Sequence, residues 1–288
     1  MEKITVMGEA LLRLYTGQPL EQAEQFQVTC GGTGLETAYT IARLGGRCSL
    51  LACIGEDPFG DRILEWLTRH GVDTDQMQHT GRAATTLCFV REGMQAYYPA
   101  PGADRMLSAA ALREERLGES CILHVSSMDL GEEPCRFAHQ RAIRTIRQQG
   151  GCISFAPCYH PALWDSSAAW QAAMRSFLPF ADLITVGQES LALLTGCPDA
   201  AGAHRLLLEG NCKLLCYLSG QGVRLTNGRS TAVVPVDQPV PEPAAAGALL
   251  YALAQDWIPG KGLSGLSHGE LYRLAEFIVL YALPPALG

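Results

Sequence analysis

The sequence predicts an α/β fold with a mostly parallel central sheet. Short β-branched or apolar runs alternate with amphipathic helical patterns along the whole chain. A hydrophobic content of 48% in 288 residues is enough to fill one large core. Because no repeat or linker interrupts the alternation, we expect a single domain over residues 1–288, with right-handed crossovers between its parallel strands.

The elements follow from periodicity and from turn residues. We expect strands at residues 3–7, 47–55, 121–127, 151–156 and 213–219, and helices at residues 37–44, 244–253 and 271–283. A hairpin is expected over residues 84–98, because two apolar runs flank a turn that contains glycine.

Composition excludes several function classes. A net charge of −7 and a pI near 5.5 argue against a nucleic-acid partner. The eleven cysteines contain no C-x-x-C pair and many lie in apolar runs, which is typical of reduced core residues. No apolar run reaches membrane-spanning length and the N-terminus lacks signal-peptide features, so we expect a cytoplasmic protein without a membrane partner.

The most informative stretch is residues 236–253. A loop that leads into a buried helix is a favoured place to hold a phosphate, because free backbone N–H groups point outward there. This loop carries Pro239, Pro241 and Pro243, which lack that N–H group, and it places Glu242 where an anionic ligand would sit.

The same stretch resembles the C-terminal signature of the PfkB (ribokinase-like) sugar kinases, V-D-T-T-G-A-G-D. In that family the G-A-G amides hold the transferring phosphate and the aspartate is the catalytic base. The matching positions here are Val240, Pro241, Glu242 and Pro243. The resemblance extends from residue 4 to residue 287 and is closest to fructokinases and 2-keto-3-deoxygluconate kinases. It implies a ribokinase-like three-layer sandwich, with a small β lid built from residues 11–30 and 83–103.

The sugar side of the resemblance is also altered. G-E-A-L-L-R-L matches the first family strand, but the sugar-binding aspartate corresponds to Arg13. G-G-T-G-L-E-T-A matches the first signature, but the sugar-binding asparagine corresponds to Glu36, and a carboxylate accepts hydrogen bonds without donating them. The sugar-pocket positions implied by the resemblance are Glu9, Arg13, Gly31, Gly32, Glu36 and Asp104.

The nucleotide side departs from the family pattern in the same way. The N-x-x-E motif that organises Mg²⁺ in the family reads Gly187 to Ser190, and the D-P-N-x-R strand end reads A-P-C-Y-H. Cys158 and His160 in that strand end have no third partner at metal-ligand spacing. The nucleotide-side positions implied by the resemblance are Gly187, Ser190, Ser219, Gly222 and Glu276.

Two functions remain open. The first is a sugar-kinase homologue that has lost phosphoryl transfer and is kept for binding or assembly, with a small sugar or sugar acid as a possible ligand and no required cofactor. The second is an active carbohydrate kinase that uses ATP and Mg²⁺, with Asp237 or Glu242 as a displaced base. In either case we expect a homodimer formed through the lid, because an isolated flap could not bury its apolar residues Leu87, Phe89, Tyr97 and Tyr98.

Overall fold

The computed structural model describes residues 2–92, 94–126, 130–255 and 262–282. Its central sheet has eight strands in the order β14-β13-β12-β11-β10-β9-β1-β4. The strands are β1 (Lys3–Met7), β4 (Arg47–Leu51), β9 (Ser120–Ser126), β10 (Cys152–Ala156), β11 (Leu183–Gly187), β12 (Leu214–Ser219), β13 (Gly222–Thr226) and β14 (Thr231–Val234). All neighbours pair in parallel except β12–β13 and β13–β14. The expected α/β class with a mostly parallel sheet is confirmed.

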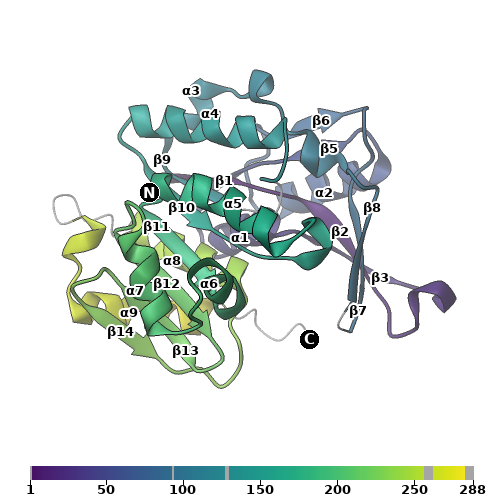
Figure 1. Cartoon of the computed structure of the whole chain (residues 1–288). Coiled ribbons are helices and arrows are strands. Elements are labelled where there is room, and N and C mark those ends of the chain that lie inside the picture. Colours follow the sequence, from purple (N-terminus) through teal and green to yellow (C-terminus); the bar gives the residue numbers. More distant parts are fainter. Residues whose placement is uncertain (1, 93, 127–129, 256–261, 283–288) are drawn as a thin grey trace.

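Helices cover both faces of this sheet, and each face has its own core (Figure 1). One face packs against α1 (Thr33–Arg43), α2 (Pro58–Arg69), α8 (Glu242–Gln255) and α9 (His268–Tyr281). The other packs against α3 (Glu114–Leu117), α4 (Cys135–Gln148), α5 (Ser167–Phe177), α6 (Gln188–Thr195) and α7 (Ala200–Leu208). Short 3₁₀ turns are η1 (Leu20–Gln22), η2 (Ala103–Met106), η3 (Ala109–Ala111), η4 (Pro161–Leu163), η5 (Leu178–Phe180) and η6 (Leu263–Gly265).

A second sheet of four strands forms the lid, in the order β3-β2-β7-β8. It contains β2 (Leu11–Tyr15), β3 (Gln27–Gly31), β7 (Leu87–Arg91) and β8 (Met94–Tyr98), and it extends away from the central sheet (Figure 1). The hairpin predicted over residues 84–98 is therefore correct, but it is not an isolated flap. Strand β7 pairs with β2 from the first lid segment, so part of its apolar surface is covered within the chain.

Two predicted elements need correction. The single strand expected over residues 47–55 is two strands, because Ala52 separates β4 in the central sheet from β5 (Cys53–Gly55), which pairs with β6 (Gln78–Thr80). The helix expected to begin at residue 37 begins at Thr33, directly after Gly32 with φ 111°. The end of the helix expected at residue 283 lies outside the described residues; α9 as described ends at Tyr281.

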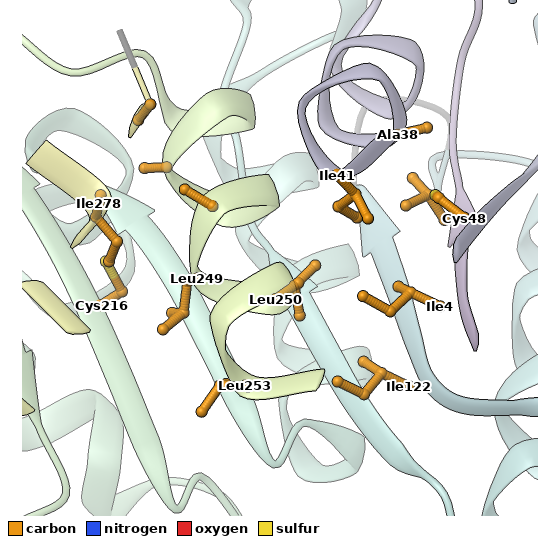
Figure 2. Packing of buried hydrophobic residues seen from close by; sticks show 14 of the residues in the cluster. Ile4, Ala38, Ile41, Cys48, Ile122, Cys216, Leu249, Leu250, Leu253 and Ile278 are labelled. Carbon is orange, nitrogen blue, oxygen red and sulfur yellow. The ribbon is translucent and has the colours of Figure 1, made fainter. Parts of the chain in front are cut away.

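Helix α8 runs along the middle of the molecule, in close contact with α1. The approach depends on Gly247, because a Cβ at this position would lie 2.7 Å from Thr40 Cβ and 2.8 Å from the Thr37 carbonyl oxygen. Figure 2 shows Leu249, Leu250 and Leu253 pointing from α8 toward the sheet. Small residues on one side and leucines on the other explain how the Ala-rich run becomes a buried helix.

Candidate functional site

Some of the residues implied by the family resemblance lie where strands β1, β10 and β11 end. Glu9 follows β1, Cys158 follows β10, and Gly187 is the last residue of β11. Because these strands are parallel, their carboxyl ends lie along one edge of the sheet. That edge is the usual position of a ligand site in an open α/β sheet.

Glu9 is fully engaged by its own chain. It is 2% exposed, and Oε1 accepts hydrogen bonds from the backbone N and the hydroxyl of Thr33, both at 2.5 Å. Oε2 accepts a hydrogen bond from Ser126 Oγ at 3.1 Å. Since Thr33 is the first residue of α1, the carboxylate stabilises the start of that helix and joins it to the ends of β1 and β9.

Arg13 is not the exposed strand residue that a lid position would suggest. Its guanidinium forms an ion pair with Glu36, and the two side chains are 26% and 28% exposed. The stem of Arg13 lies over Gly31, where a Cβ would approach Arg13 Cδ to 3.1 Å. Two positions that the resemblance implies for sugar binding therefore bind each other here, across the junction between the lid and α1.

Burial and the neighbouring Arg13 guanidinium act on the pKa of Glu36 in opposite directions. Desolvation raises the pKa of Glu36 above its usual value, while the neighbouring guanidinium of Arg13 lowers it and Glu9 raises it further. Arg13 therefore offsets part of the cost of keeping a carboxylate inside the cleft, and it has correspondingly less capacity to bind an external anion.

The side chain of Glu242 turns away from the start of its own helix. Its carboxylate accepts a hydrogen bond from the backbone N–H of Gly187, the N-cap residue of α6. Glu242 Oε1 lies so close to Gly187 that a Cβ there would collide with it. We expected this carboxylate to occupy the N-terminus of α8; instead it occupies the N-terminus of α6, because that helix offers the free N–H group.

Burial in this position raises the pKa of Glu242 to about 7, with the hydrogen bond from Gly187 acting in the opposite direction and Glu189 adding to the increase. Glu242 Oε2 is buried and has no hydrogen-bond partner among the described residues. The neighbouring thiol of Cys158 also has its pKa raised well above the usual value, chiefly by burial and further by Glu242. A thiol in this environment is a poor nucleophile.

The remainder of the proline-containing stretch is partly helical. We expected Pro243 to belong to the loop, but α8 begins at Glu242 and includes it, since proline is tolerated in the first turn of a helix. The carbonyl oxygen of Pro243 accepts a hydrogen bond from Thr37 Oγ1 at 3.1 Å. Val240 is buried, whereas Pro241 and Asp237 are exposed. Proline has no ionisable side chain, so Pro243 cannot accept a proton at the position that the resemblance implies for the catalytic base.

The nucleotide-side positions make local contacts. Ser190 Oγ accepts a hydrogen bond from the Tyr159 backbone at 3.0 Å. Ser219 Oγ accepts from the Gln221 backbone at 3.3 Å, and its hydroxyl donates to the Gly222 carbonyl at 3.4 Å. Glu276 is exposed on α9.

Three residues that the sequence analysis did not single out, Thr33, Ser126 and Thr86, contact predicted sugar-pocket positions. Thr33 and Ser126 hold Glu9, and Asp104 accepts a hydrogen bond from Thr86. The ring of Tyr97 meets the ring of His160 edge-on, with centroids 5.4 Å apart. Tyr97 therefore faces the cleft and does not share the outer face of β8 with Tyr98, because successive side chains of a strand point to opposite faces. The alternating directions of the β8 side chains could be predicted from the sequence, whereas the partners of Glu9 could not.

Within the described ranges, no group of three or more His, Cys, Asp or Glu side chains is arranged to hold a metal ion. The helices described in these ranges are also too short or too polar to cross a bilayer. None of the eleven cysteines, all of which lie in described ranges, forms a disulfide.

Comparison with known proteins agrees with this architecture. The family model described as "pfkB family carbohydrate kinase" matches residues 1–259. Fructokinase-1 of Oryza sativa subsp. japonica is 30% identical over 273 residues, which cover 88% of this chain and 84% of the relative. Fructokinase-2 of Solanum habrochaites is 32% identical over 229 residues, which cover 76% and 69%.

Solved structures show the same fold. The crystal structure of fructokinase from Xylella fastidiosa superposes with a TM-score of 0.84 at 23% identity, covering 98% of this chain and 92% of that one. Aminoimidazole riboside kinase from Salmonella enterica gives a TM-score of 0.81 at 20% identity, covering 97% and 92%. With a family model matched over most of its length and fructokinases as relatives, this chain belongs to the PfkB family of carbohydrate kinases.

Proposed function

We propose that this protein is a PfkB-family homologue that no longer transfers phosphate from ATP to a sugar and is retained for binding or assembly. The observation that carries the proposal is the pairing of the cleft residues with one another. Arg13 binds Glu36 where the resemblance implies a sugar, and Glu242 binds Gly187 where it implies nucleotide phosphates. Phosphoryl transfer depends on positioned donors and a base that orients the acceptor hydroxyl.

Electrostatics in the cleft support the same proposal. Glu9 raises the pKa of Glu36, and Glu189 raises the pKa of Glu242. The carboxylates of Glu242, Glu9 and Glu189 all raise the pKa of the Cys158 thiol. An incoming triphosphate would meet these like charges, while the Gly187 N–H that could receive a phosphate is already used. Losing one oxyanion-type donor typically costs on the order of 10²–10³ in rate.

The second candidate is an active carbohydrate kinase with Glu242 as a displaced base. One observation favours it: a pKa of about 7 is close to the value at which a general base is most effective near neutral pH. Asp237 is the weaker alternative, because it is exposed outside α8. ATP and Mg²⁺ would be required only in this second case.

ATP turnover across hexoses, ketoses and keto-sugar acids separates the two candidates. We expect no turnover above background. Turnover that is lost in Glu242→Gln but kept in Asp237→Asn would establish the active kinase and overturn our proposal. Calorimetric titration with Mg·ATP tests the blocked site directly: we expect no micromolar binding in the unmodified protein and measurable binding in Glu242→Gly, where the Gly187 N–H becomes available.

The proposal includes a cytoplasmic location and a homodimer formed through the lid. Eleven cysteines without a disulfide fit a reducing compartment. Strand β8, at the edge of the lid sheet, exposes Met94 by 50% at its first residue and Tyr98 by 60% at its last, and the ring centroid of Phe89 lies 5.3 Å from that of Phe26 and 5.8 Å from that of Tyr98. Exposed apolar surface of this kind favours association.

A further inference from the structure

Helix α4 carries a concentration of positive charge in an acidic chain. It contains Arg136, Arg141, Arg144 and Arg147 but no aspartate or glutamate, whereas the whole chain has a net charge of −7. The buried face of this amphipathic helix packs on the sheet with small and apolar residues, so the arginines lie toward its outer side. Figure 1 shows α3 and α4 next to each other and apart from the lid strands β2, β3, β7 and β8.

A groove of about 380 Å³ lies between these two helices. Its lining shares no residue with the cleft described above, and it includes two of the four arginines. The other two are used within the chain: Arg136 Nη2 donates to Ser176 Oγ at 3.4 Å, and Arg147 Nη2 donates to the Phe180 carbonyl oxygen at 2.6 Å. The groove is lined by Glu114 of α3 and by Phe137, Arg141, Arg144, Thr145 and Gln148 of α4.

The guanidinium groups in this groove are only partly used. Arg141 Nε donates to Glu114 Oε1 at 2.7 Å, which leaves the two Nη groups of Arg141 without a hydrogen bond to the described residues. Arg144 is exposed and forms no hydrogen bond or ion pair with the described part of the chain. Since Glu114 is the acidic lining residue, one uncompensated positive charge and several N–H donors face the groove.

An exposed aromatic ring continues the same stripe of the helix. Phe137 is 52% exposed, and it lies four residues before Arg141 and seven before Arg144, a spacing that places all three on one face. From residue 137 to residue 148 the stripe is about 16 Å long at 1.5 Å per residue. An extended peptide of about five residues has this length. Aromatic and arginine side chains are the residue types that contribute most to binding energy at protein interfaces.

We propose that the α3–α4 groove binds an acidic segment of another protein. Carboxylates of this segment pair with Arg144 and with the Nη groups of Arg141, and an apolar side chain packs on Phe137. The net negative charge of the rest of the chain repels an acidic partner, so the arginines of α4 fix where it docks. A symmetric contact with a second copy would instead bring the arginines of two α4 helices together.

The inference goes beyond the proposed function. The groove is separate from the cleft, and its arginines would be available in an active kinase as well as in an inactive homologue. ATP turnover therefore tests the proposed function without bearing on the groove.

Panning a display library of random 12-residue peptides on the unmodified full-length protein tests the inference. We expect the selected peptides to carry at least two Asp or Glu residues and one large apolar side chain. In fluorescence anisotropy, Arg144→Ala and Phe137→Ala should each weaken binding of the selected peptide about tenfold. Arg144→Lys, which keeps the charge, should weaken it less, and binding should decrease as salt is added.

Helix α2 provides matched controls. Phe59 is 45% exposed, and Arg69 is exposed but paired with Glu65 on the same helix. Phe59→Ala and Arg69→Ala should leave peptide binding unchanged. Because Phe137 and Arg144 are also exposed, their replacement by alanine should not alter the melting temperature of the protein by more than the α2 controls do.

Three results would overturn the inference. The first is a selection that yields no binding peptide or peptides without acidic residues. The second is peptide binding that is insensitive to both Arg144→Ala and Phe137→Ala. The third is tighter binding of a single-stranded 12-nucleotide DNA than of the selected peptide, which would make the groove a general polyanion site.

Discussion

At the residue scale, the cleft is defined by side chains that bind each other. Arg13 and Glu36 lie at two positions where the resemblance implies an acidic residue and an amide, and together they form an ion pair. Glu242 lies at a position where the resemblance implies glycine, and it reaches the N–H of Gly187. A single charge in either place would be buried without compensation, so each change is tolerated because a partner is within reach.

The ion pair predicts a strong coupling between its members. Arg13→Met should destabilise the protein by roughly 1–3 kcal/mol, because Glu36 would be left partly buried without its cation. Glu36→Gln in the same chain should recover most of the loss. Urea denaturation of the two single variants and the double variant measures the coupling.

The matched control is Arg69→Met, which breaks the exposed pair with Glu65 on α2 and should cost no more than about 0.5 kcal/mol. Additive effects of Arg13→Met and Glu36→Gln would contradict the pairing.

Glu242 predicts a pH dependence of stability. Its pKa is about 7 in the folded protein against the usual 4.5, so between these values the folded chain binds a proton that the unfolded chain has released. The contribution of Glu242 to the free energy of unfolding should therefore decrease as the pH rises from 4.5 to 7. Above pH 7 this contribution should stay constant.

Glu242→Gln, which stays neutral, should be more stable than the unmodified protein by up to about 3 kcal/mol near pH 8, and the difference should vanish near pH 4.5. Denaturation series at several pH values measure this difference. The same series on Glu65→Gln, at an exposed site on α2, is the control for the substitution itself. A constant difference between the Glu242 variant and the unmodified protein at all pH values would argue against a buried, titrating carboxyl group.

At the scale of elements, the contact between α1 and α8 positions both halves of the cleft. Helix α1 carries Glu36, and α8 begins at Glu242. Gly247 allows the two helices to approach, and Thr37 Oγ1 donates to the Pro243 carbonyl oxygen. The position of Glu36 relative to Glu242 therefore depends on the contact between α1 and α8.

Gly247→Val should destabilise the protein by about 1–3 kcal/mol, because its side chain would collide with Thr40 Cβ and the Thr37 carbonyl oxygen. Thermal denaturation measures the effect. Gly269→Val, in the first turn of α9, meets no atom within 4 Å of its Cβ and should cost far less. Equal losses in the two variants would mean that helix propensity, rather than the α1–α8 contact, explains the result.

At the scale of the whole molecule, the lid is the surface for which we propose a partner copy. Its inner face carries Arg13 and Tyr97 toward the cleft, and its edge strand β8 exposes Met94 and Tyr98. A four-stranded sheet with one side on the cleft and exposed apolar residues along its edge strand suits pairing with a second lid.

Light scattering at micromolar protein should therefore give the mass of a dimer. The combined change Met94→Asp and Tyr98→Asp should convert it to a monomer, because both charges would be buried in the interface. Phe137→Asp alters a residue that is 52% exposed on α4 and should leave the dimer intact. A monomeric mass for the unmodified protein would exclude this assembly.

The sequence by itself determined the fold class, the family resemblance and the positions at which the family residues are replaced. These properties depend on local periodicity and on motifs of consecutive residues, such as V-P-E-P at residues 240–243. The sequence also indicated that Pro243 cannot act as a base, because that conclusion depends only on residue type.

Only the tertiary structure decided what the replacing residues do. Arg13 and Glu36 are 23 residues apart, and Glu242 is far along the chain from Gly187, so no local pattern indicates that they bind each other. The groove beside Arg144 likewise combines residues of α3 and α4. Pairings of this kind arise from the packing of distant elements, which fixes distances, burial and the pKa of each group.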